Sequence, residues 1–221
     1  MKNMSVKKKR NGPIMFPKAT LERLKMYHAL LQEEKSEYIS SEEIARKLSI
    51  KPEQVRKDIS YLDYSGKPKV GYHISSLVDA LDELFGTKLR DNIIIIGAGH
   101  LGKALANYKG FVNFGIRVVA IFDNDPEKLG TYVGELVVLP LKDLDRVIRR
   151  FNVKIGTICV PGESAQKTVD LLIKKGIKAI WNFAPVILEV PENILVENMD
   201  IARSVLTLKH LLDRTPTGKI R

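Results

Sequence analysis

The first third of the chain carries apolar residues at helical spacing, interrupted by short turns, between residues 19 and 72. Apolar positions three and four residues apart predict helices that each bury one face. The first helix is expected to begin after Thr20, whose hydroxyl suits an N-cap, and to run to Leu31. Its apolar face is predicted to comprise Leu21, Leu24, Tyr27 and Leu31.

Two shorter helices are predicted to follow, separated by a tight turn. Ser40, with Glu43 three residues later, forms a capping box and predicts the start of the second helix. Pro52 comes after the turn and suits the first turn of a helix, where no amide hydrogen is needed. The third helix is expected over residues 53–62. Its inward residues are predicted to be Val55, Ile59 and Leu62, and its outward residues Arg56, Lys57, Ser60 and Tyr61.

Two short helices joined by a brief turn have the helix-turn-helix layout, in which the second helix reads DNA. Outward cations on that helix reach guanine edges or phosphates, and hydroxyl groups bond phosphate oxygens. Residues 64–72 are predicted to form a β-hairpin whose Gly-Lys-Pro-Lys tip makes a basic wing. The alternative is an ordinary three-helix bundle with a charged face. The candidate DNA contacts are Ser40, Gln54, Arg56, Lys57, Ser60, Tyr61, Lys67 and Lys69.

From about Asn92 onward, short β-rich runs alternate with helical segments, which is typical of a parallel α/β sheet. An amphipathic segment at residues 74–84 is predicted to be a connecting helix. The predicted fold class is therefore α/β, with an N-terminal winged helix-turn-helix domain, a Rossmann-type parallel sheet domain and a C-terminal helix. The expected parts are a basic flexible arm at residues 1–16, the winged helix at 17–84, the Rossmann domain at 85–198 and the terminal helix at 199–213.

A glycine-rich segment lies between an apolar β-branched strand and a helix, the context in which G-x-G-x-x-G indicates dinucleotide binding. Gly97 permits a tight turn, Gly99 lets the backbone approach a pyrophosphate, and Gly102 lets the helix pack on the strand. The helix N-terminus then offers free amides and a positive dipole end to the phosphates. The predicted contacts are Gly97, Ala98, Gly99, His100, Leu101 and Gly102; His100 is alternatively a solvent-facing loop residue.

The next β run, residues 116–122, ends at Asp123, about 20 residues beyond the glycine loop. An acidic residue at this place accepts hydrogen bonds from the adenosine ribose hydroxyls and repels a 2′-phosphate, which favours NAD over NADP. Asn124 follows in the same turn and joins the predicted cofactor site. The alternative for Asp123 is a plain turn residue in the sequence Asp-Asn-Asp-Pro.

A later strand is predicted at residues 155–160, and residues 179–185 are predicted to be another strand end and its loop; both strand ends fall at the carboxyl edge of the sheet, where ligands bind. The candidates for the nicotinamide side are therefore Val160, Pro161, Asn182, Phe183 and Ala184, although burial alone would explain Phe183. A final helix is expected from Asp200 to about Leu212. Its stripe of Ile201, Val205, Leu208 and Leu212 needs a partner surface, in this chain or in a second subunit.

The charge distribution supports a polyanionic partner for the first third of the chain. The formal net charge is +10, and residues 1–72 hold 16 Lys and Arg against nine Asp and Glu, whereas the remaining 149 residues hold 20 against 17. A solvated basic tail is the alternative, since Lys7 to Arg10 supply much of the excess. The single cysteine, the lack of an 18-residue apolar run and the lack of a signal h-region predict a cytoplasmic protein with no membrane contact.

Candidate catalytic chemistry is sparse. The four histidines, His28, His73, His100 and His210, are scattered, and no tyrosine is followed by lysine four residues later, as short-chain dehydrogenases require. No spacing indicates a metal site, and Cys159 is interpreted as a core thiol rather than an oxidation sensor. The sequence therefore predicts a binding protein with no catalytic residues rather than an enzyme.

A basic winged helix joined to a dinucleotide domain and a terminal helix resembles the Rex family of redox-sensing transcriptional repressors, from about Pro17 to Leu212. The segments that carry the resemblance are residues 55–61 (VRKDISY), 70–72 (VGY), 97–102 (GAGHLG), 106–111 (ANYKGF), 122–126 (FDNDP) and 182–185 (NFAP). The wing departs from the usual family pattern, since residues 62–69 read LDYSGKPK, which puts the operator preference in doubt.

The resemblance implies a homodimer that binds an inverted-repeat operator and releases it when NADH binds, while NAD⁺ permits binding. It implies that the terminal helix is a dimerisation helix exchanged between subunits. It also adds Tyr108 and Asp200 as residues that respond to the redox state of the nicotinamide. Two other interpretations remain: a regulator that binds another adenosine nucleotide such as coenzyme A, against which the 3′-phosphate and Asp123 argue, and a small NAD-dependent oxidoreductase.

Overall fold

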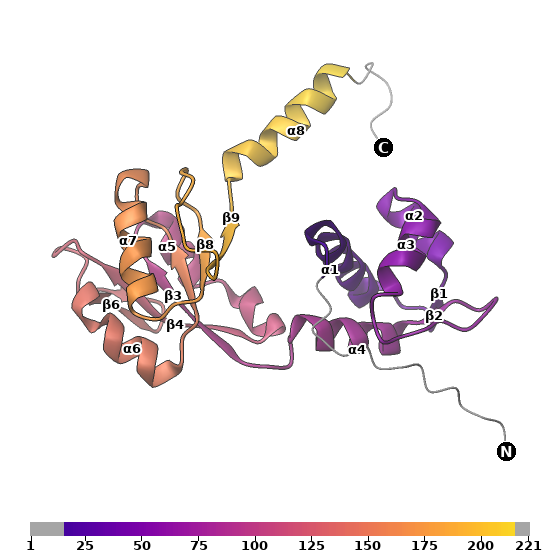
Figure 1. Cartoon of the computed structure of the whole chain (residues 1–221), viewed down its shortest axis with the longest axis horizontal. Helices are drawn as coiled ribbons and strands as arrows, with labels where there is room; N and C mark the ends of the chain where they lie inside the picture. The colour runs from indigo at the N-terminus through magenta and orange to yellow at the C-terminus, as the bar shows by residue number, and fades with distance from the viewer. Residues whose placement is uncertain (1–15, 215–221) are drawn as a thin grey trace. The chain divides into compact units, whose positions relative to one another are not determined.

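The chain divides into two units between Lys88 and Leu89. The structure is a computed structural model that describes residues 16–214 (Figure 1). The predicted arm at residues 1–16 lies outside the described residues except for Phe16, whose ring packs 5.7 Å from that of Tyr61.

The first unit is built from four helices and one small sheet. The helices are α1 (Lys18–Glu33), α2 (Ser41–Leu48), α3 (Pro52–Ile59) and α4 (Ile74–Phe85). Strands β1 (Tyr38–Ile39) and β2 (Tyr72–His73) pair antiparallel. All four helices contribute to one core of buried residues: Leu24, Tyr27, Leu31, Ile39, Ile44, Ala45, Val55, Ile59, Leu62, Ile74, Leu77 and Leu81.

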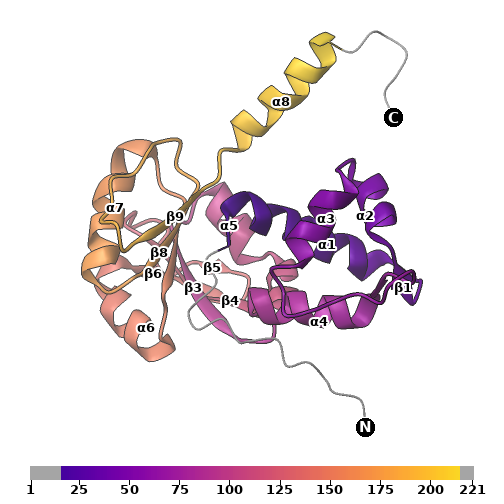
Figure 2. The same ribbon diagram turned by 45° about the vertical axis from the view of Figure 1, so that its right-hand side comes forward.

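The predicted helix-turn-helix is present, with the expected caps. Ser40 caps α2 through the predicted capping box, because its hydroxyl accepts the Glu43 amide hydrogen and the Glu43 carboxylate accepts that of Ser40. Ser49 then turns the chain with a left-handed backbone, φ 55°, before Pro52 opens α3. Both views show α2 and α3 side by side (Figures 1 and 2).

Several predictions for this unit were wrong in detail. Helix α1 begins at Lys18 after Pro17, so Thr20 is not its N-cap but a buried residue of its first turn. Helix α3 ends at Ile59, which leaves Ser60 and Tyr61 in the turn that follows. The amphipathic helix α4 is not a free connector, because Leu77 and Leu81 are fully buried in the core of the first unit.

The predicted wing hairpin is a loop with a tight turn at its tip. Its only ladder is a single bridge, in which Lys67 and Gly71 exchange backbone hydrogen bonds of 2.8 and 3.0 Å. Pro68 lacks an amide hydrogen and Lys69 has φ 63°, so neither extends a strand. The strand that does form, β2, pairs instead with β1 from the segment between α1 and α2.

The second unit is a seven-stranded sheet with helices on both faces. Its strands are β3 (Asp91–Ile96), β4 (Ile116–Asp123), β5 (Tyr132–Val133), β6 (Leu136–Pro140), β7 (Ile155–Ile158), β8 (Ala179–Asn182) and β9 (Leu195–Asn198). Its helical segments are α5 (His100–Ala106), η1 (Lys109–Phe114), η2 (Leu141–Asp143), α6 (Leu144–Phe151) and α7 (Gly162–Lys174).

The strand order is β5-β6-β4-β3-β7-β8-β9, and all pairs are parallel except β5 with β6. Without the antiparallel edge strand β5, this is the doubly wound dinucleotide-binding order, which reverses direction between β3 and β7. Ligands bind outside the carboxyl ends of strands at such a reversal. The predicted Rossmann-type sheet is therefore confirmed, and its topology places the site at the ends of β3, β4 and β7.

The consecutive isoleucines of β3 face opposite sides of the sheet. Ile94 and Ile96 pack with residues of α6 and α7, which lie together beside the sheet in both views (Figures 1 and 2). Ile95 packs in a separate core with Ile121 and Val138, against which Leu105 of α5 lies. A central parallel strand buried on both faces reads as a continuous apolar run, which explains the sequence of β3.

Some strands were misjudged from the sequence. The strand predicted at residues 155–160 ends at Ile158, whereas the strand end and loop predicted at residues 179–185 are present as β8 up to Asn182 and the loop after it. Strands β5, β6 and β9 were not predicted at all; β5 and β9 are short and partly exposed, so they lack the apolar signature of central strands. Helix α8 (Ile201–Arg214) is present as expected, and its stripe of Ile201, Val205, Leu208 and Leu212 is 56% to 64% exposed.

Candidate functional site

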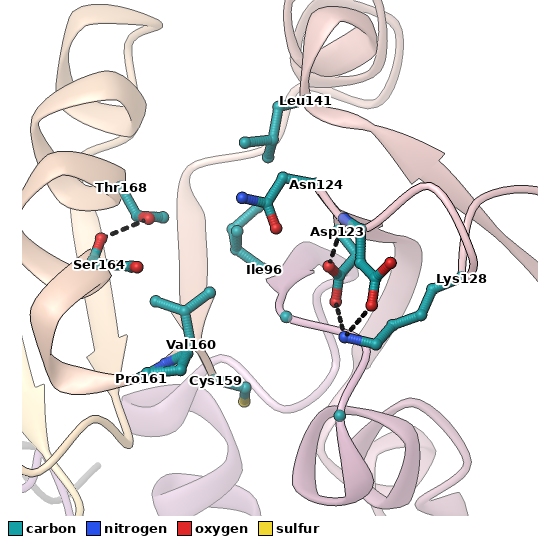
Figure 3. Close-up of a pocket in the computed structure, with 13 residues that line it drawn as sticks. Ile96, Asp123, Asn124, Lys128, Leu141, Cys159, Val160, Pro161, Ser164 and Thr168 are labelled. Carbon is teal, nitrogen blue, oxygen red and sulfur yellow. Dashed lines mark hydrogen bonds and ion pairs between the residues drawn. The ribbon is translucent and has the colours of Figure 1, made fainter.

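A pocket of about 490 Å³ opens at the carboxyl ends of β3, β4 and β7. Its size falls within the range of small-molecule sites. Six predicted cofactor residues line it: Gly97, Gly99, Asp123, Asn124, Val160 and Pro161. Figure 3 shows Asp123 and Lys128 on one side of the pocket and Ser164 and Thr168, from α7, on the other.

The glycine loop has the geometry that its motif predicts. Gly97 has φ 108°, and a Cβ there would lie 2.5 Å from the Cys159 carbonyl oxygen. At Gly102 a Cβ would come within 1.9 Å of the Gly97 carbonyl oxygen, so only glycine lets α5 approach the loop this closely. A Cβ on Gly99 would meet no atom within 4 Å. The backbone at Gly99 therefore faces open space, where a ligand can approach it.

Asp123 closes the β4 end of the pocket and is 7% exposed. Its carboxylate accepts the Ala98 amide hydrogen at 2.7 Å and the Asp125 amide hydrogen at 2.9 Å. Burial by itself would raise the pKa of Asp123, but these two backbone bonds and the Lys128 ammonium together lower it below its usual value. The carboxylate is therefore ionised near neutral pH, as acceptance of ribose hydroxyls requires.

Lys128 is a pocket residue that the sequence reasoning missed. Its ammonium lies 3.3 Å from Asp123 Oδ2 and 3.2 Å from Asp125 Oδ2, as the dashed lines in Figure 3 show. It is the only cationic side chain among the residues that line this pocket. The available signal was its place three residues after Asp125, in the turn that follows the predicted strand. Both carboxylates raise the pKa of Lys128, which keeps it protonated.

The wall opposite Asp123 comes from the segment after β7. Val160 and Pro161 lead into α7, whose first turns carry Ser164 and Thr168, and the Thr168 hydroxyl donates to the Ser164 carbonyl at 2.8 Å. Cys159 also lines the pocket, and burial raises the pKa of its thiol to about 12. The thiol is therefore protonated and unreactive at neutral pH, in line with the core role expected of it.

Asn182 is 1% exposed and its polar atoms bond within the fold. Its amide donates to the Val186 carbonyl at 3.0 Å and to Asn198 Oδ1 at 2.8 Å, while its oxygen accepts the Ala184 amide hydrogen. These bonds shape the loop after β8 and join it to β9. Phe183 packs edge-on against Trp181, with ring centroids 4.6 Å apart. The nicotinamide contacts expected of these residues remain predictions.

The other predicted cofactor residues lie outside the pocket lining. Ala98 is buried and offers its amide to Asp123, while Leu101 and Gly102 belong to α5. His100 and Tyr108 are exposed, and Tyr108 contacts the ring of Phe111 at a centroid distance of 5.0 Å. The Asp200 carboxylate accepts the Arg203 amide hydrogen at 2.9 Å and so caps α8.

In the first unit, four of the eight predicted DNA contacts, Ser40, Arg56, Lys67 and Lys69, line a groove of about 420 Å³ between the start of α2 and the wing loop. The lining residues are Ser40, Ser41, Glu42, Arg56, Gly66, Lys67, Lys69, Val70, Gly71 and Tyr72. Lys57 and Ser60 are exposed but are not part of the lining. The Lys67 ammonium is held by the Tyr38 hydroxyl at 2.9 Å, which fixes the base of the wing.

The guanidinium of Arg56 is engaged by two carboxylates. Its Nη1 lies 2.9 Å from Glu42 Oε1 and also donates to the Ser41 hydroxyl at 2.9 Å, while Nη2 lies 3.0 Å from Glu53 Oε1. Gln54, another predicted DNA contact, is turned inward and donates to Asp58 at 2.9 Å. A contact of Gln54 with DNA therefore requires its amide to leave Asp58, and a contact through Nη1 of Arg56 requires that atom to leave Glu42 or Ser41.

Asp58 was missed by the sequence reasoning, yet it anchors α3. Its carboxylate is fully buried and accepts from Arg23 Nε at 2.6 Å, Arg23 Nη2 at 2.8 Å, the Tyr27 hydroxyl at 2.8 Å and Gln54 at 2.9 Å. Burial would raise the pKa of Asp58, and these donors more than offset it and lower it. Two side chains of α1, Arg23 and Tyr27, thus hold the candidate reading helix in one orientation.

Two family models match parts of the chain. Residues 16–60 match the model described as "Putative DNA-binding protein N-terminus". Residues 89–186 match the model described as "CoA binding domain". The redox-sensing transcriptional repressor Rex 2 of Thermotoga maritima is 49% identical over 201 residues, which are 91% of this chain and 98% of that protein. The chain belongs to the Rex family.

Other Rex proteins agree with this membership. The redox-sensing transcriptional repressor Rex of Clostridium botulinum is 40% identical over 200 residues, which cover 89% of this chain and 95% of that one. Among solved structures, the Rex-family repressor RSP in complex with NAD⁺ and operator DNA superposes with a TM-score of 0.85 at 34% identity, covering 91% of this chain and 94% of that chain. RSP in complex with NADH gives a TM-score of 0.83.

Two searches of the described residues were negative. No cluster of three or more histidine, cysteine, aspartate or glutamate residues within residues 16–214 is placed to hold a metal ion. No helix in that part of the chain is long and apolar enough to cross a membrane.

Proposed function

We propose that this chain is a transcriptional repressor that senses the NADH/NAD⁺ ratio: it binds an inverted-repeat operator without NADH and releases it when NADH binds. The single observation that carries the proposal is the presence of both halves of that function in one chain of a redox-sensing repressor family: a helix-turn-helix unit and a unit with a dinucleotide pocket. The complexes of RSP with NAD⁺ and operator DNA and with NADH support the same ligands here.

The pocket is matched to the adenosine and pyrophosphate parts of a dinucleotide. The Gly97–Gly99 backbone and the α5 amides receive the pyrophosphate, while Asp123 accepts the ribose hydroxyls with Asn124 beside it. Val160 and Pro161 lie toward the nicotinamide, across the strand reversal. Tyr108 and Asp200 are assigned, by the family resemblance, to sensing the redox state of the nicotinamide.

In the first unit, Arg56 and Lys57 of α3 and Ser60 and Tyr61 in the turn after it read the major groove, while Lys67 and Lys69 of the wing and Ser40 before α2 contact phosphates. An inverted repeat requires two copies of the chain. We assign the dimer contact to the exposed stripe of α8, exchanged between subunits. The nucleotide acts as a signal in the cytoplasm rather than as a substrate.

NADH can release DNA only through a difference in its affinity for the DNA-bound and free arrangements of the dimer. The test is binding of the full chain to a labelled Rex-type palindromic duplex at fixed salt, titrated separately with NADH and NAD⁺. Release by NADH and not by NAD⁺ is the expected result. DNA binding that ignores both nucleotides would contradict the proposal.

A second candidate ligand has a specific observation in its favour. The matched model for residues 89–186 carries the description of a coenzyme A-binding domain. Coenzyme A carries a 3′-phosphate on its ribose, and the ionised Asp123 at the ribose end of the pocket repels it. Thermal-shift titrations with NADH, NAD⁺ and coenzyme A compare the two ligands directly. A larger shift with coenzyme A than with NADH would reverse the assignment.

A further inference from the structure

One aromatic side chain outside the predicted DNA contacts holds a lysine of the wing. The Lys67 ammonium donates a hydrogen bond to the Tyr38 hydroxyl at 2.9 Å and lies 5.2 Å from the centre of the Tyr38 ring. At this distance the face of an aromatic ring also attracts an ammonium. The hydrogen bond raises the pKa of Lys67, so the ammonium stays charged at neutral pH. A phenol of β1 thus holds a flexible cation of the wing in place.

We propose that Tyr38 is a positioning residue for DNA binding, which places the Lys67 ammonium for its phosphate contact before DNA arrives. The inference rests on the proposed function, in which Lys67 contacts a phosphate. It goes beyond that function because it gives Tyr38 a part in DNA affinity, although Tyr38 does not line the groove beside the wing.

Tyr38 itself is held in a defined position. It pairs with His73 between β1 and β2, and its ring packs edge-on against the His73 ring with centroids 5.2 Å apart. The Tyr64 hydroxyl accepts the His73 amide hydrogen at 2.9 Å and so fixes the partner strand. The Tyr38 hydroxyl is therefore a fixed point to which the ammonium can bond.

The backbone of Lys67 is held as well, because Lys67 and Gly71 exchange hydrogen bonds of 2.8 and 3.0 Å. Gly71 has φ 107°, and a Cβ there would lie 2.5 Å from the Ile39 carbonyl oxygen. Only glycine therefore lets the base of the wing come this close to β1, where Lys67 reaches Tyr38, 29 residues earlier in the chain. With its backbone and its ammonium both bonded, the side chain keeps little of the freedom of a solvated lysine.

A fixed ammonium remains able to bind DNA. It has three hydrogens to donate, and the bond to Tyr38 uses one of them. Lys67 also lines the groove beside Ser40 and Lys69, which the proposed function brings to phosphates. A solvated lysine loses its rotamer freedom when it binds a phosphate, whereas Lys67 has already lost it on folding. Tyr38 should therefore strengthen DNA binding without contact to any base edge.

The experiment measures the affinity of the full chain for an operator duplex and for a scrambled duplex at several salt concentrations. Tyr38→Phe keeps the ring against His73 and removes only the hydroxyl. Binding should weaken by about threefold for each copy of the chain, and so by about tenfold for a dimer, by the same factor on both duplexes. The slope of log K against log salt should stay unchanged, because Lys67 still reaches its phosphate. Lys67→Ala should instead make that slope shallower by about one per copy.

Two controls separate positioning from a general effect of a lost hydroxyl. Tyr132→Phe removes an exposed hydroxyl from β5 in the other unit and should leave DNA binding unchanged. In the Lys67→Ala background, Tyr38→Phe should cause no further loss of affinity, since the group that Tyr38 positions is gone. Thermal melts by circular dichroism identify any variant that is not folded at the temperature of the measurement.

Three results would overturn the inference. If Tyr38→Phe binds both duplexes as tightly as the unmodified chain, Lys67 needs no positioning. If it binds them more tightly, Tyr38 holds Lys67 away from phosphates. If the loss is equal with and without Lys67, Tyr38 acts through other residues. Failure of the proposed function looks different, because the unmodified chain would then bind the operator no better than the scrambled duplex.

Discussion

Among residues 16–214, each unit contains one buried carboxylate, and both carboxylates are ionised near neutral pH, but they have different partners. Asp58 is 0% exposed and is surrounded by side chains of α1 and α3. Asp123 is 7% exposed and is held by two backbone amides and one lysine at the rim of a cavity of about 490 Å³. In both cases donors more than offset the cost of burial and lower the pKa.

The difference indicates what each carboxylate is for. The partners of Asp58 bond both of its oxygens and fix α3. Asp58 therefore stabilises the first unit and the orientation of the candidate reading helix. At Asp123 the Lys128 ammonium is only partly buried and can move aside, which frees Oδ2 for a ribose hydroxyl. A buried carboxylate at the rim of a cavity suits ligand binding, whereas a fully buried one whose oxygens are both bonded within the fold suits a structural role.

The largest expected effect comes from Asp58→Ala. The substitution leaves Arg23 and Tyr27 without their acceptor and should destabilise the first unit by about 3 kcal/mol. This value is at the lower end of the range for removing one partner of a buried ion pair, because Arg23 can turn toward water. Trp181 is the only tryptophan and lies in β8 of the second unit. Its fluorescence therefore reports unfolding of that unit, while circular dichroism reports both.

Asp58→Ala should lower the midpoint temperature of unfolding measured by circular dichroism and leave the midpoint measured by Trp181 fluorescence unchanged. Asp63→Ala, an exposed change in the same unit, serves as the control and should shift neither. Equal shifts of both midpoints in Asp58→Ala would mean that the two units unfold together and that Asp58 does not stabilise the first unit alone.

The next effect is on nucleotide affinity. Asp123→Ala removes the ribose acceptor and the partner of the Ala98 amide, so NADH binding measured by calorimetry should weaken by about tenfold to a hundredfold. Discrimination against NADPH should relax at the same time, since the repelling charge is gone. An NADH affinity within twofold of the unmodified chain would remove Asp123 from the site.

Acid should affect both units through these carboxylates. Each has a folded-state pKa below its usual value of 3.8, so its stabilisation is complete well above pH 3.8 and is lost as the pH falls through the lowered value. The temperatures of both thermal transitions should therefore decrease as the pH is lowered from about 5 to about 2. Asp58→Asn should flatten this pH dependence for the first unit alone. A pH dependence of the circular dichroism transition that is unaltered by Asp58→Asn would show that other carboxyls cause it.

The smallest expected effect concerns Lys128. Lys128→Met leaves Asp123 and Asp125 without their cation, so NADH binding should weaken by about threefold through repulsion of the pyrophosphate. NADPH binding should weaken more than NADH binding, because the 2′-phosphate of NADPH is expected to lie closest to these carboxylates. Lys142→Met, a change of the same type outside the pocket lining, is the control. Tighter NADH binding in Lys128→Met would contradict this prediction, because it would mean that displacing Lys128 from Asp123 costs more than its attraction for the pyrophosphate contributes.

The sequence predicted local features well and long-range partners poorly. The capping box at Ser40 and the roles of Gly97 and Gly102 follow from spacing of a few residues, and the structure has all of them. Asp58 and Lys128 were missed for different reasons. Asp58 looks like one more charge on a polar helix until Arg23, 35 residues away, folds onto it.

Lys128 belongs to a turn, where lysines are usually solvated, and only the fold brings the cavity beside it. The wing was mispredicted because its residues satisfy a hairpin pattern, although Pro68 and the left-handed Lys69 prevent a ladder. Sequence spacing thus indicated which segments carry the candidate site residues. Tertiary packing determined which of their side chains form hydrogen bonds and ion pairs within the fold.

We propose that occupancy of the Asp123 pocket by NADH controls the affinity of α3 for operator DNA. The most direct measurement is the NADH concentration that releases half of a preformed operator complex, for the unmodified chain and for Asp123→Ala, in one salt condition. We expect release by NADH in both, with a midpoint at least tenfold higher in Asp123→Ala. Equal midpoints would contradict it, because release would then originate somewhere other than this pocket.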